Sequence, residues 1–301
     1  MEIHSPKEFI AQMHEMIKFM QKIHNQEYKI VASPETKAEQ LKDFTELRLL
    51  LKMPIWPKAV EEEQILGADE KYDKGLATIL SLIKCDMENK SVLSLNCGDG
   101  ISCYLSANNF YAKKSVGFDI TEDENWKTIK KDNVVLTTNW NVVKENGPYD
   151  IIYANDLLDH SQDFDKTLEN IKELRTNASR IYIRCHPWAS RHGAHLHSQI
   201  NKAYIHLVFT EDELQSMGYK TPKFTHRLLD PITSYRNLFA KLGYSIVSQQ
   251  PCRTTVEPFF YTQERIMRRI KEKWQTMSDY SNGEKFPRDF MEIEAVDFTL
   301  I

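Results

Sequence analysis

Hydrophobic positions divide the chain into a helical first part and a later part in which short apolar runs alternate with helical segments. In the first part, apolar residues recur at three- and four-residue steps over 9–23, 41–51 and 76–83. This spacing is typical of amphipathic helices. From residue 91 onward, apolar runs end at turn-forming residues, and segments of helical spacing separate them. Short buried strands that alternate with helices predict a parallel sheet covered on both faces.

Seven of these runs are expected to form strands. They cover residues 91–95, 115–119, 134–138, 149–154, 180–184, 244–247 and 293–301. We therefore predict an α/β fold with a doubly wound, mostly parallel seven-stranded sheet and an N-terminal helical extension. The expected boundaries are 1–74 for the extension and 75–301 for the α/β domain.

Composition narrows the class of protein. The 301 residues are 41% hydrophobic and 27% charged, which supports a sizeable core and excludes a disordered chain. No stretch approaches the length of a membrane-spanning helix and no secretory signal is visible, so no membrane partner is expected. The net charge of −4 does not favour a nucleic-acid partner. The five cysteines form no CxxC pair, which predicts reduced thiols and a cytoplasmic location.

The strongest local signal is a glycine-rich turn between the first predicted strand and a helix. Its sequence is Asn96-Cys97-Gly98-Asp99-Gly100. Glycines lack Cβ, so a ligand can approach the backbone where the helix N-terminus exposes free N–H groups. Asp119 lies 19 residues beyond Gly100 at the end of the next strand, where a carboxylate can bind ribose hydroxyls. The pattern predicts a nucleoside-containing ligand.

Four segments, in this order, resemble motifs of the class I S-adenosylmethionine-dependent methyltransferases. Val92–Gly100 resembles the first motif, roughly V-L-D-L-G-C-G-x-G, and Val116–Ile120 resembles the second, which carries the ribose-binding acid. Tyr149–His160 is similar to the fourth strand with its loop, and Phe239–Val247 to a late helix–strand unit. The resemblance implies a Rossmann-like fold, S-adenosylmethionine as cofactor, and transfer of its methyl group to oxygen or nitrogen.

The resemblance also implies a cofactor site at the ends of the first four strands. Trp140 would either stack on adenine or serve as a partly buried core aromatic. Asn155 and Asp156 would either face the methionine moiety or the acceptor, or cap a helix. The expected cofactor residues are Asn96, Cys97, Gly98, Gly100, Asp119, Ile120, Asn139, Trp140 and Asn155.

Two residues depart from the first motif. Ser94 stands where the family has an acid that helps to hold the methionine end, and Asn96 stands where it has the first glycine. Asn96 can adopt left-handed geometry, so the turn can survive. These departures support an alternative, a non-catalytic methyltransferase-like binding or assembly module. A nicotinamide-dependent enzyme is a third hypothesis, because Cys103 occupies the last position of a G-x-G-x-x-G-like pattern.

Five of the ten histidines fall within 21 residues that follow the fifth predicted strand. Three roles are open for histidines at this edge of an α/β sheet. They would bind the acceptor and act in acid–base chemistry, bind a metal ion, or stabilise an irregular loop through hydrogen bonds to its backbone. We favour the acceptor site, with His186, Arg191 and His192 facing the acceptor and His186 as the base. No residue is assigned as a metal ligand. The five histidines are His186, His192, His195, His197 and His206.

The predicted activity is therefore methylation of a small molecule, or of a terminal group of a larger one, on oxygen or nitrogen. The N-terminal helices are expected to pack against the sheet, to cover the acceptor site, or to form a homo-oligomer or an assembly contact. The sequence itself does not identify the acceptor.

Overall fold

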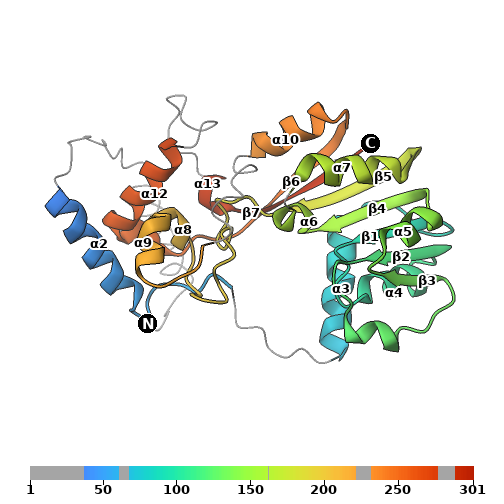
Figure 1. Ribbon diagram of the computed structural model, residues 1–301, viewed down its shortest axis with the longest axis horizontal. Coiled ribbons are helices and arrows are strands. Elements are labelled where there is room, and N and C mark those ends of the chain that lie inside the picture. Colours follow the sequence, from blue (N-terminus) through green and yellow to red (C-terminus); the bar gives the residue numbers. More distant parts are fainter. Residues whose placement is uncertain (1–36, 61–67, 162, 222–231, 277–288) are drawn as a thin grey trace, which may run out of the picture. The chain divides into compact units, whose positions relative to one another are not determined.

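The computed structural model describes residues 37–60, 68–161, 163–221, 232–276 and 289–301 (Figure 1). The helix expected over 9–23 lies outside these residues. The described parts of the chain form two compact units, one within residues 37–56 and 257–267 and the other within residues 57–256 and 268–301. The boundary expected at residue 74 stays a prediction.

The smaller unit contains helix α2 (Lys37–Leu51), helix α11 (Pro258–Thr262) and the first residues of helix α12 (Glu264–Thr276). Trp56 is buried, and its ring lies 5.7 Å from that of Phe259. Arg265 forms ion pairs with α2, at 3.1 Å from Asp43 and 2.7 Å from Glu46. Segments far apart in the sequence therefore form one unit, and the helix expected over 41–51 is confirmed.

The larger unit is built on a seven-stranded sheet with the order β3-β2-β1-β4-β5-β7-β6. Strands β1 to β5 are parallel, while β7 lies antiparallel between β5 and β6. This is the predicted fold class, a mostly parallel seven-stranded sheet of the class I methyltransferase type. The strands are β1 (Ser91–Leu95), β2 (Lys114–Phe118), β3 (Val134–Thr137), β4 (Tyr149–Asn155), β5 (Arg175–Cys185), β6 (Ile246–Arg253) and β7 (Ile293–Leu300).

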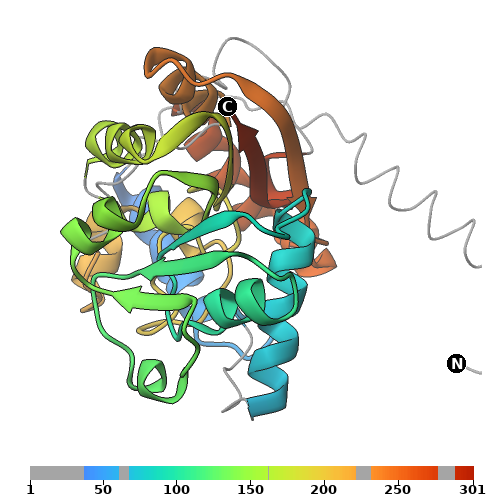
Figure 2. The same ribbon diagram turned by 90° about the vertical axis from the view of Figure 1, so that its right-hand side faces the viewer.

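Helices cover both faces of this sheet (Figure 2). On one face, apolar residues of α3 and α4, such as Ile79 and Leu105, pack with Tyr153 and Tyr182 of the strands. On the other face, α7 and α10 pack against the strands in a second buried cluster. The helices of the larger unit besides α12 are α3 (Ala68–Leu82), α4 (Ile101–Asn108), the 3₁₀ turn η1 (Glu124–Thr128), α5 (Trp140–Asn146), α6 (Leu157–His160), α7 (Phe164–Glu173), α8 (Ile205–Val208), α9 (Glu211–Ser216), α10 (Ile232–Lys241) and α13 (Asp289–Glu292).

The histidine-rich segment after β5 is packed into the larger unit. Tyr204 is fully buried, and its hydroxyl donates a hydrogen bond of 2.9 Å to the carbonyl of Met291, just before β7. The side chain of Asn201 pairs with both backbone polar groups of Val60. Gly193 lies so close to the backbone of Trp188 that a Cβ would come within 2.1 Å of its carbonyl oxygen. This segment therefore has a defined shape at the end of the sheet.

Across the described parts of the chain, none of the helices combines the length and the apolar character that crossing a membrane requires.

Candidate active site

In the turn after β1, Gly100 is packed against neighbouring side chains, whereas the space beside Gly98 is open. Asn96, Gly98 and Gly100 all have left-handed backbone geometry, with φ of 58°, 53° and 80°. A Cβ on Gly100 would lie 2.7 Å from Cδ1 of Leu136, whereas a Cβ on Gly98 would have no atom within 4 Å. The asparagine in the position of the family's first glycine thus adopts the geometry that the turn requires. The open side at Gly98 gives a ligand access to the backbone.

The structure brings the turn and Asp119 together. The N–H of Gly98 donates a hydrogen bond of 2.9 Å to Oδ2 of Asp119, and the N–H of Thr121 donates one of 3.3 Å to Oδ1. Trp126 in η1 donates from its indole to the carbonyl of Gly98 at 2.7 Å. Asp119 is only partly buried. Since a carboxylate offers about four acceptor sites, Asp119 retains the capacity to bind a sugar hydroxyl.

Asn155 connects the turn to the end of β4. Asn96 donates from its side-chain amide to the carbonyl of Asn155 at 3.1 Å. The Asn155 amide in turn donates to Oδ2 of Asp156 at 2.8 Å. Oδ1 of Asn155 is buried and accepts no hydrogen bond within the described part of the chain. Because buried polar atoms are nearly always hydrogen-bonded, this oxygen points to a ligand at the end of β4.

The remaining expected cofactor residues have varied surroundings. Asn139 caps α5 by accepting a hydrogen bond from the N–H of Asn141. The ring of Trp140 packs edge-on against Phe118, with 5.0 Å between the centroids. Ile120 is 86% exposed beside Asp119. Cys97 lies buried behind the turn, and a hydrogen bond with Cys103 together with burial raises the pKa of its thiol. Cys97 therefore contributes packing and its backbone.

Ser94 is buried at the end of β1, with Oγ 3.5 Å from Oγ of Ser102 in α4. The family has an acid at this position, whereas Ser94 offers a neutral hydroxyl and no charge. The turn itself is formed in spite of this substitution.

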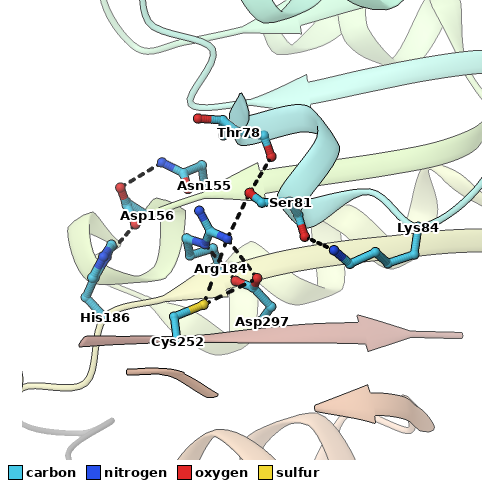
Figure 3. Close-up of polar contacts among 9 residues, drawn as sticks. All are labelled: Thr78, Ser81, Lys84, Asn155, Asp156, Arg184, His186, Cys252 and Asp297. Atoms are coloured by element: carbon cyan, nitrogen blue, oxygen red, sulfur yellow. Dashed lines mark hydrogen bonds and ion pairs between the residues drawn. The ribbon is translucent and has the colours of Figure 1, made fainter. Parts of the chain in front are cut away.

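Four residues from separate segments meet at the carboxyl edge of the sheet. Nδ1 of His186, after β5, lies 2.5 Å from Oδ1 of Asp156, after β4 (Figure 3). Nδ1 of His192 lies 2.7 Å from Oε1 of Glu294 at the start of β7. The two imidazole rings are 5.1 Å apart. One donor atom each from His186, His192 and Glu294 lie within 4.8 Å of one another. We call these four residues the edge cluster.

The pKa of each carboxyl group in the edge cluster is lowered from its ordinary value. Burial, the largest single influence, raises the pKa of Asp156, but the interactions with His186, His192 and Arg184 together lower it by more. Burial likewise raises the pKa of Glu294, and the interactions with His192, His186 and the backbone of Arg191 together lower it by more. The cluster therefore concentrates two carboxylates and two imidazoles in one partly buried place.

The other expected site residue, Arg191, is held through its side chain by the backbone of Lys58, and its expected role at the acceptor stays a prediction. Its guanidinium donates to the carbonyl of Lys58 from Nε at 2.9 Å and from Nη2 at 2.6 Å. His206 is fully buried, with Nε2 2.5 Å from the carbonyl of Trp188. Burial lowers the pKa of His206 to about 3, so this histidine is neutral and structural. The ring centroids of His195 and His197 lie 6.0 Å and 6.2 Å from the ring centroid of His192.

An ion pair joins β5, which ends just before His186, to β7, which contains Glu294. Arg184 of β5 forms a bidentate contact with Asp297 of β7, with distances of 2.7 Å and 2.8 Å (Figure 3). Arg184 also donates to Oγ of Ser81 in α3, and the thiol of Cys252 in β6 contacts Asp297. This pair fixes β7 against β5 just beside His186 and Glu294.

Sequence reasoning did not identify Glu294 or Trp126 as site residues. Glu294 interrupts the apolar pattern of the last strand, and a charged residue among Ile293, Ala295 and Val296 is the signal that could have revealed it. Trp126 lies in a polar segment after β2, where the sequence shows no periodicity. Its contact with Gly98 depends on the path of that segment.

Comparison with known proteins decides the class. A family model described as a methyltransferase domain matches residues 68–249, more than half of the chain. No curated protein matches the chain. The chain belongs to the methyltransferase-domain family, and it is a methyltransferase enzyme. The class expected from the sequence motifs, the class I S-adenosylmethionine-dependent methyltransferases, is thereby confirmed.

Several solved structures are similar to the chain at low identity. A methyltransferase dependent on S-adenosylmethionine from Mesorhizobium loti has 10% identity and a TM-score of 0.46, over 78% of this chain and 99% of that one. One from Archaeoglobus fulgidus has 18% identity and a TM-score of 0.44, over 78% and 94%. Coclaurine N-methyltransferase, bound to N-methylheliamine and SAH, has 12% identity and a TM-score of 0.46, over 96% and 95%. The assignment of the class depends on the family model alone.

Proposed function

We propose that the protein methylates an oxygen or nitrogen atom of a small molecule, or of a terminal group, that binds at the carboxyl edge of the sheet beside His186 and His192. The observation that carries this proposal is the contact between Gly98 and Asp119 next to open space at Gly98. It supports a cofactor pocket at this edge, and the edge cluster faces the same edge.

The residues around the turn fit S-adenosylmethionine. Asp119 is placed to accept hydrogen bonds from the ribose hydroxyls, and Gly98 leaves room beside its backbone. Ile120, which is largely exposed, is suited to cover the adenine. The unsatisfied Oδ1 of Asn155 can accept a hydrogen bond from the ammonium group of the methionine moiety. Ser94 can supply only a neutral hydroxyl, so binding of the methionine end depends more on Asn155.

When bound, S-adenosylmethionine supplies an electrophilic methyl group, which passes from sulfur to the acceptor atom by in-line displacement as the acceptor loses its proton. The protein contributes mainly position, because aligned reactants lower the barrier strongly. A polar chain supports this alignment: Asn96 contacts Asn155, Asn155 contacts Asp156, and Asp156 contacts His186. The cofactor turn and the acceptor side are thus joined by direct contacts.

His186 and His192 would hold the acceptor on the side opposite the cofactor turn. Arg191 holds the histidine-rich segment through Lys58, and its contact with an acceptor group stays a prediction. The cytoplasmic location and the assembly through the N-terminal helices also stay predictions.

Calorimetry with S-adenosylmethionine and S-adenosylhomocysteine tests the cofactor site. We expect both to bind, and NAD to give no heat. A binding signal with NAD but with neither of the other two ligands would contradict the proposal. The absence of a signal with all three ligands would also contradict it.

A second experiment tests the acceptor side. The His186→Ala variant is expected to lose most of its turnover in a methyl-transfer assay with candidate acceptors, while its affinity for S-adenosylhomocysteine stays within about twofold of the original. Unchanged turnover would show that the acceptor binds elsewhere. The variant Lys130→Ala, which changes an exposed residue between β2 and β3 that is not part of the edge cluster, is the matched control.

A further inference from the structure

We propose that His186, His192 and Glu294 form a binding site for a divalent transition-metal ion, with Zn²⁺ as the ion that fits the donor set best. Asp156 orients His186 from behind. The site shares His186 and His192 with the acceptor side of the proposed methyl transfer, and its test measures metal binding alone.

The geometry places three donors around one point. One donor atom from each of His186, His192 and Glu294 lies within 4.8 Å of the other two. Zinc binds histidine nitrogen and carboxylate oxygen at about 2.0–2.2 Å, so donors in a tetrahedral site are about 3.3–3.5 Å apart. Small movements of side chains therefore suffice to bring the three donors into coordination. The residues come from different elements, the end of β5, the following segment and β7, so the site depends on the folded chain.

The polar atoms of the edge cluster are buried and lie close to one another. Oδ1 of Asp156, Nδ1 of His192 and Oε2 of Glu294 are all buried. Nδ1 of His192 lies 2.7 Å from Oε1 of Glu294, and Nδ1 of His186 lies 2.5 Å from Oδ1 of Asp156. Nitrogen and oxygen donors of the kind that bind transition metals are therefore gathered in one partly buried place.

The surroundings of His186 match a common feature of metal sites. Asp156 contacts Nδ1 of His186, so the proposed metal would be bound by the other ring nitrogen, Nε2. A carboxylate behind a metal-binding histidine fixes the ring and increases its basicity. Asp156 is itself fixed by Asn155 and has left-handed backbone geometry, with φ of 58°. Strained residues of this kind persist where the surrounding structure holds them in place, often at functional sites.

Charge balance also favours a divalent cation. With neutral imidazoles, the two carboxylates give the edge cluster a charge of about −2, which a divalent ion neutralises. The nearest cationic side chain on β5, Arg184, is already paired with Asp297. The competing explanation is a direct hydrogen bond or ion pair between each histidine and its carboxylate, with no metal ion bound.

The donor set indicates the type of metal. Two histidines and one carboxylate with a free position occur in catalytic zinc sites. The same set occurs in iron(II) sites of the facial-triad type. We commit to zinc, because three ligands within one small cluster suit its tetrahedral preference, and iron is a distinguishable outcome of the test.

The test measures metal content and affinity of the full chain, produced without a histidine tag. After removal of metal by a chelator, the protein is titrated with Zn²⁺, and the bound metal is measured by elemental analysis. We expect about one zinc per chain. The variants His192→Ala and Glu294→Gln are expected to weaken zinc binding at least about a hundredfold, and Asp156→Asn about tenfold to a hundredfold. Glu292→Gln, a change two residues from Glu294 at a carboxylate that pairs with Arg253, is the matched control and should bind normally.

Circular dichroism shows which variants are folded. Cobalt(II) provides a second readout on the unaltered protein, since its visible absorption reports coordination by nitrogen and oxygen and should disappear when zinc is added. Less than about 0.1 equivalent of metal in the titration together with no cobalt spectrum would overturn the proposal and leave the ion pairs as the explanation. Equal affinity of the unaltered protein and Glu294→Gln would also overturn it. Preferential retention of iron would correct the identity of the metal. None of these readouts uses S-adenosylmethionine, so they are independent of the proposed methyl transfer.

Discussion

Gly98, in the turn after β1, donates its backbone N–H to the carboxylate of Asp119, which follows β2, at 2.9 Å. The contact ties the turn to the acid that the family uses for the ribose. It also means that any change at Asp119 affects both the ligand and the shape of the turn. The predictions below separate these effects.

Replacing Asp119 with asparagine should weaken cofactor binding with little loss of stability. The amide oxygen can still accept the hydrogen bond from Gly98, but the charge that strengthens bonds to the ribose is lost. A hydrogen bond to a charged group contributes roughly 1.5–3 kcal/mol, so affinity for S-adenosylhomocysteine should fall about tenfold to a hundredfold. Calorimetry measures the affinity and thermal melting the stability. Asp132→Asn, at an exposed position, is the control, and equal affinity of the two variants would contradict the assignment.

The two glycines of the turn should respond differently to alanine. Both have positive φ, so each substitution costs about 1–2 kcal/mol of backbone strain. The Cβ at position 100 would also meet Leu136 at 2.7 Å, whereas the Cβ at position 98 would enter open space. Gly100→Ala should therefore be the less stable variant in urea unfolding, by roughly 1–3 kcal/mol more. Gly98→Ala should fold and lose cofactor affinity. Normal affinity in Gly98→Ala would show that no ligand lies against this backbone.

The ion pair between Arg184 and Asp297 should be important for stability. Its side chains are only 18% and 11% exposed, and breaking a largely buried pair leaves a charge without its partner. We expect Asp297→Asn to lower the free energy of unfolding by roughly 2–3 kcal/mol. Arg184→Lys should also be destabilising, because lysine cannot form the bidentate contact.

A double-mutant cycle measures the coupling of this pair. The exposed pair of Lys241 and Asp165, with 64% and 46% exposure, provides the comparison and should contribute less than about 1 kcal/mol. Similar coupling in both pairs would show that burial does not strengthen the contact between β5 and β7.

His206 should make the protein less stable as the pH falls. Burial lowers its pKa from 6.5 to about 3 in the folded state, whereas the unfolded chain takes up a proton near the ordinary value. Between these values the unfolded state binds more protons, so stability falls as the pH falls from about 6.5 to about 3. At pH 5 the contribution is roughly 2 kcal/mol.

The variant His206→Gln keeps a donor for the carbonyl of Trp188 but does not titrate. Its stability should decline less between pH 7 and pH 5 than that of the unaltered protein in matched urea unfolding curves. The same pH slope in both proteins would mean that His206 takes up a proton in the folded state as readily as in the unfolded chain.

Local signals predicted most of the fold and the cofactor turn. The alternation of apolar runs and helical segments located the strands, and Asp119 was found because its distance from Gly100 reflects one strand–helix–strand unit. Trp140 was placed correctly after β3, but its surroundings could not be read from the chain, since its packing on Phe118 is a contact between different elements.

The sequence predicted the two histidines of the edge cluster but not their contacts with the two carboxylates. His186 and His192 could be located because they follow the fifth strand. Their partners could not, because Glu294 is about a hundred residues further along the chain, and only the insertion of β7 beside β5 brings it to them. The sequence likewise could not show the contact between Arg191 and Lys58, because these residues are 133 positions apart in the chain. The expected role of Arg191 at the acceptor stays a prediction.

The position of β7 between β5 and β6 has a consequence for biosynthesis. This strand follows the other six strands along the chain, and it supplies both Glu294 and the carboxylate that pairs with Arg184. A nascent chain can therefore complete the five parallel strands and the turn at Gly98 while His192 still lacks its carboxylate neighbour. The carboxyl edge becomes complete only once β7 has been synthesised, so a product truncated before residue 293 would retain the residues of the nucleoside pocket but would lack Glu294 of the edge cluster.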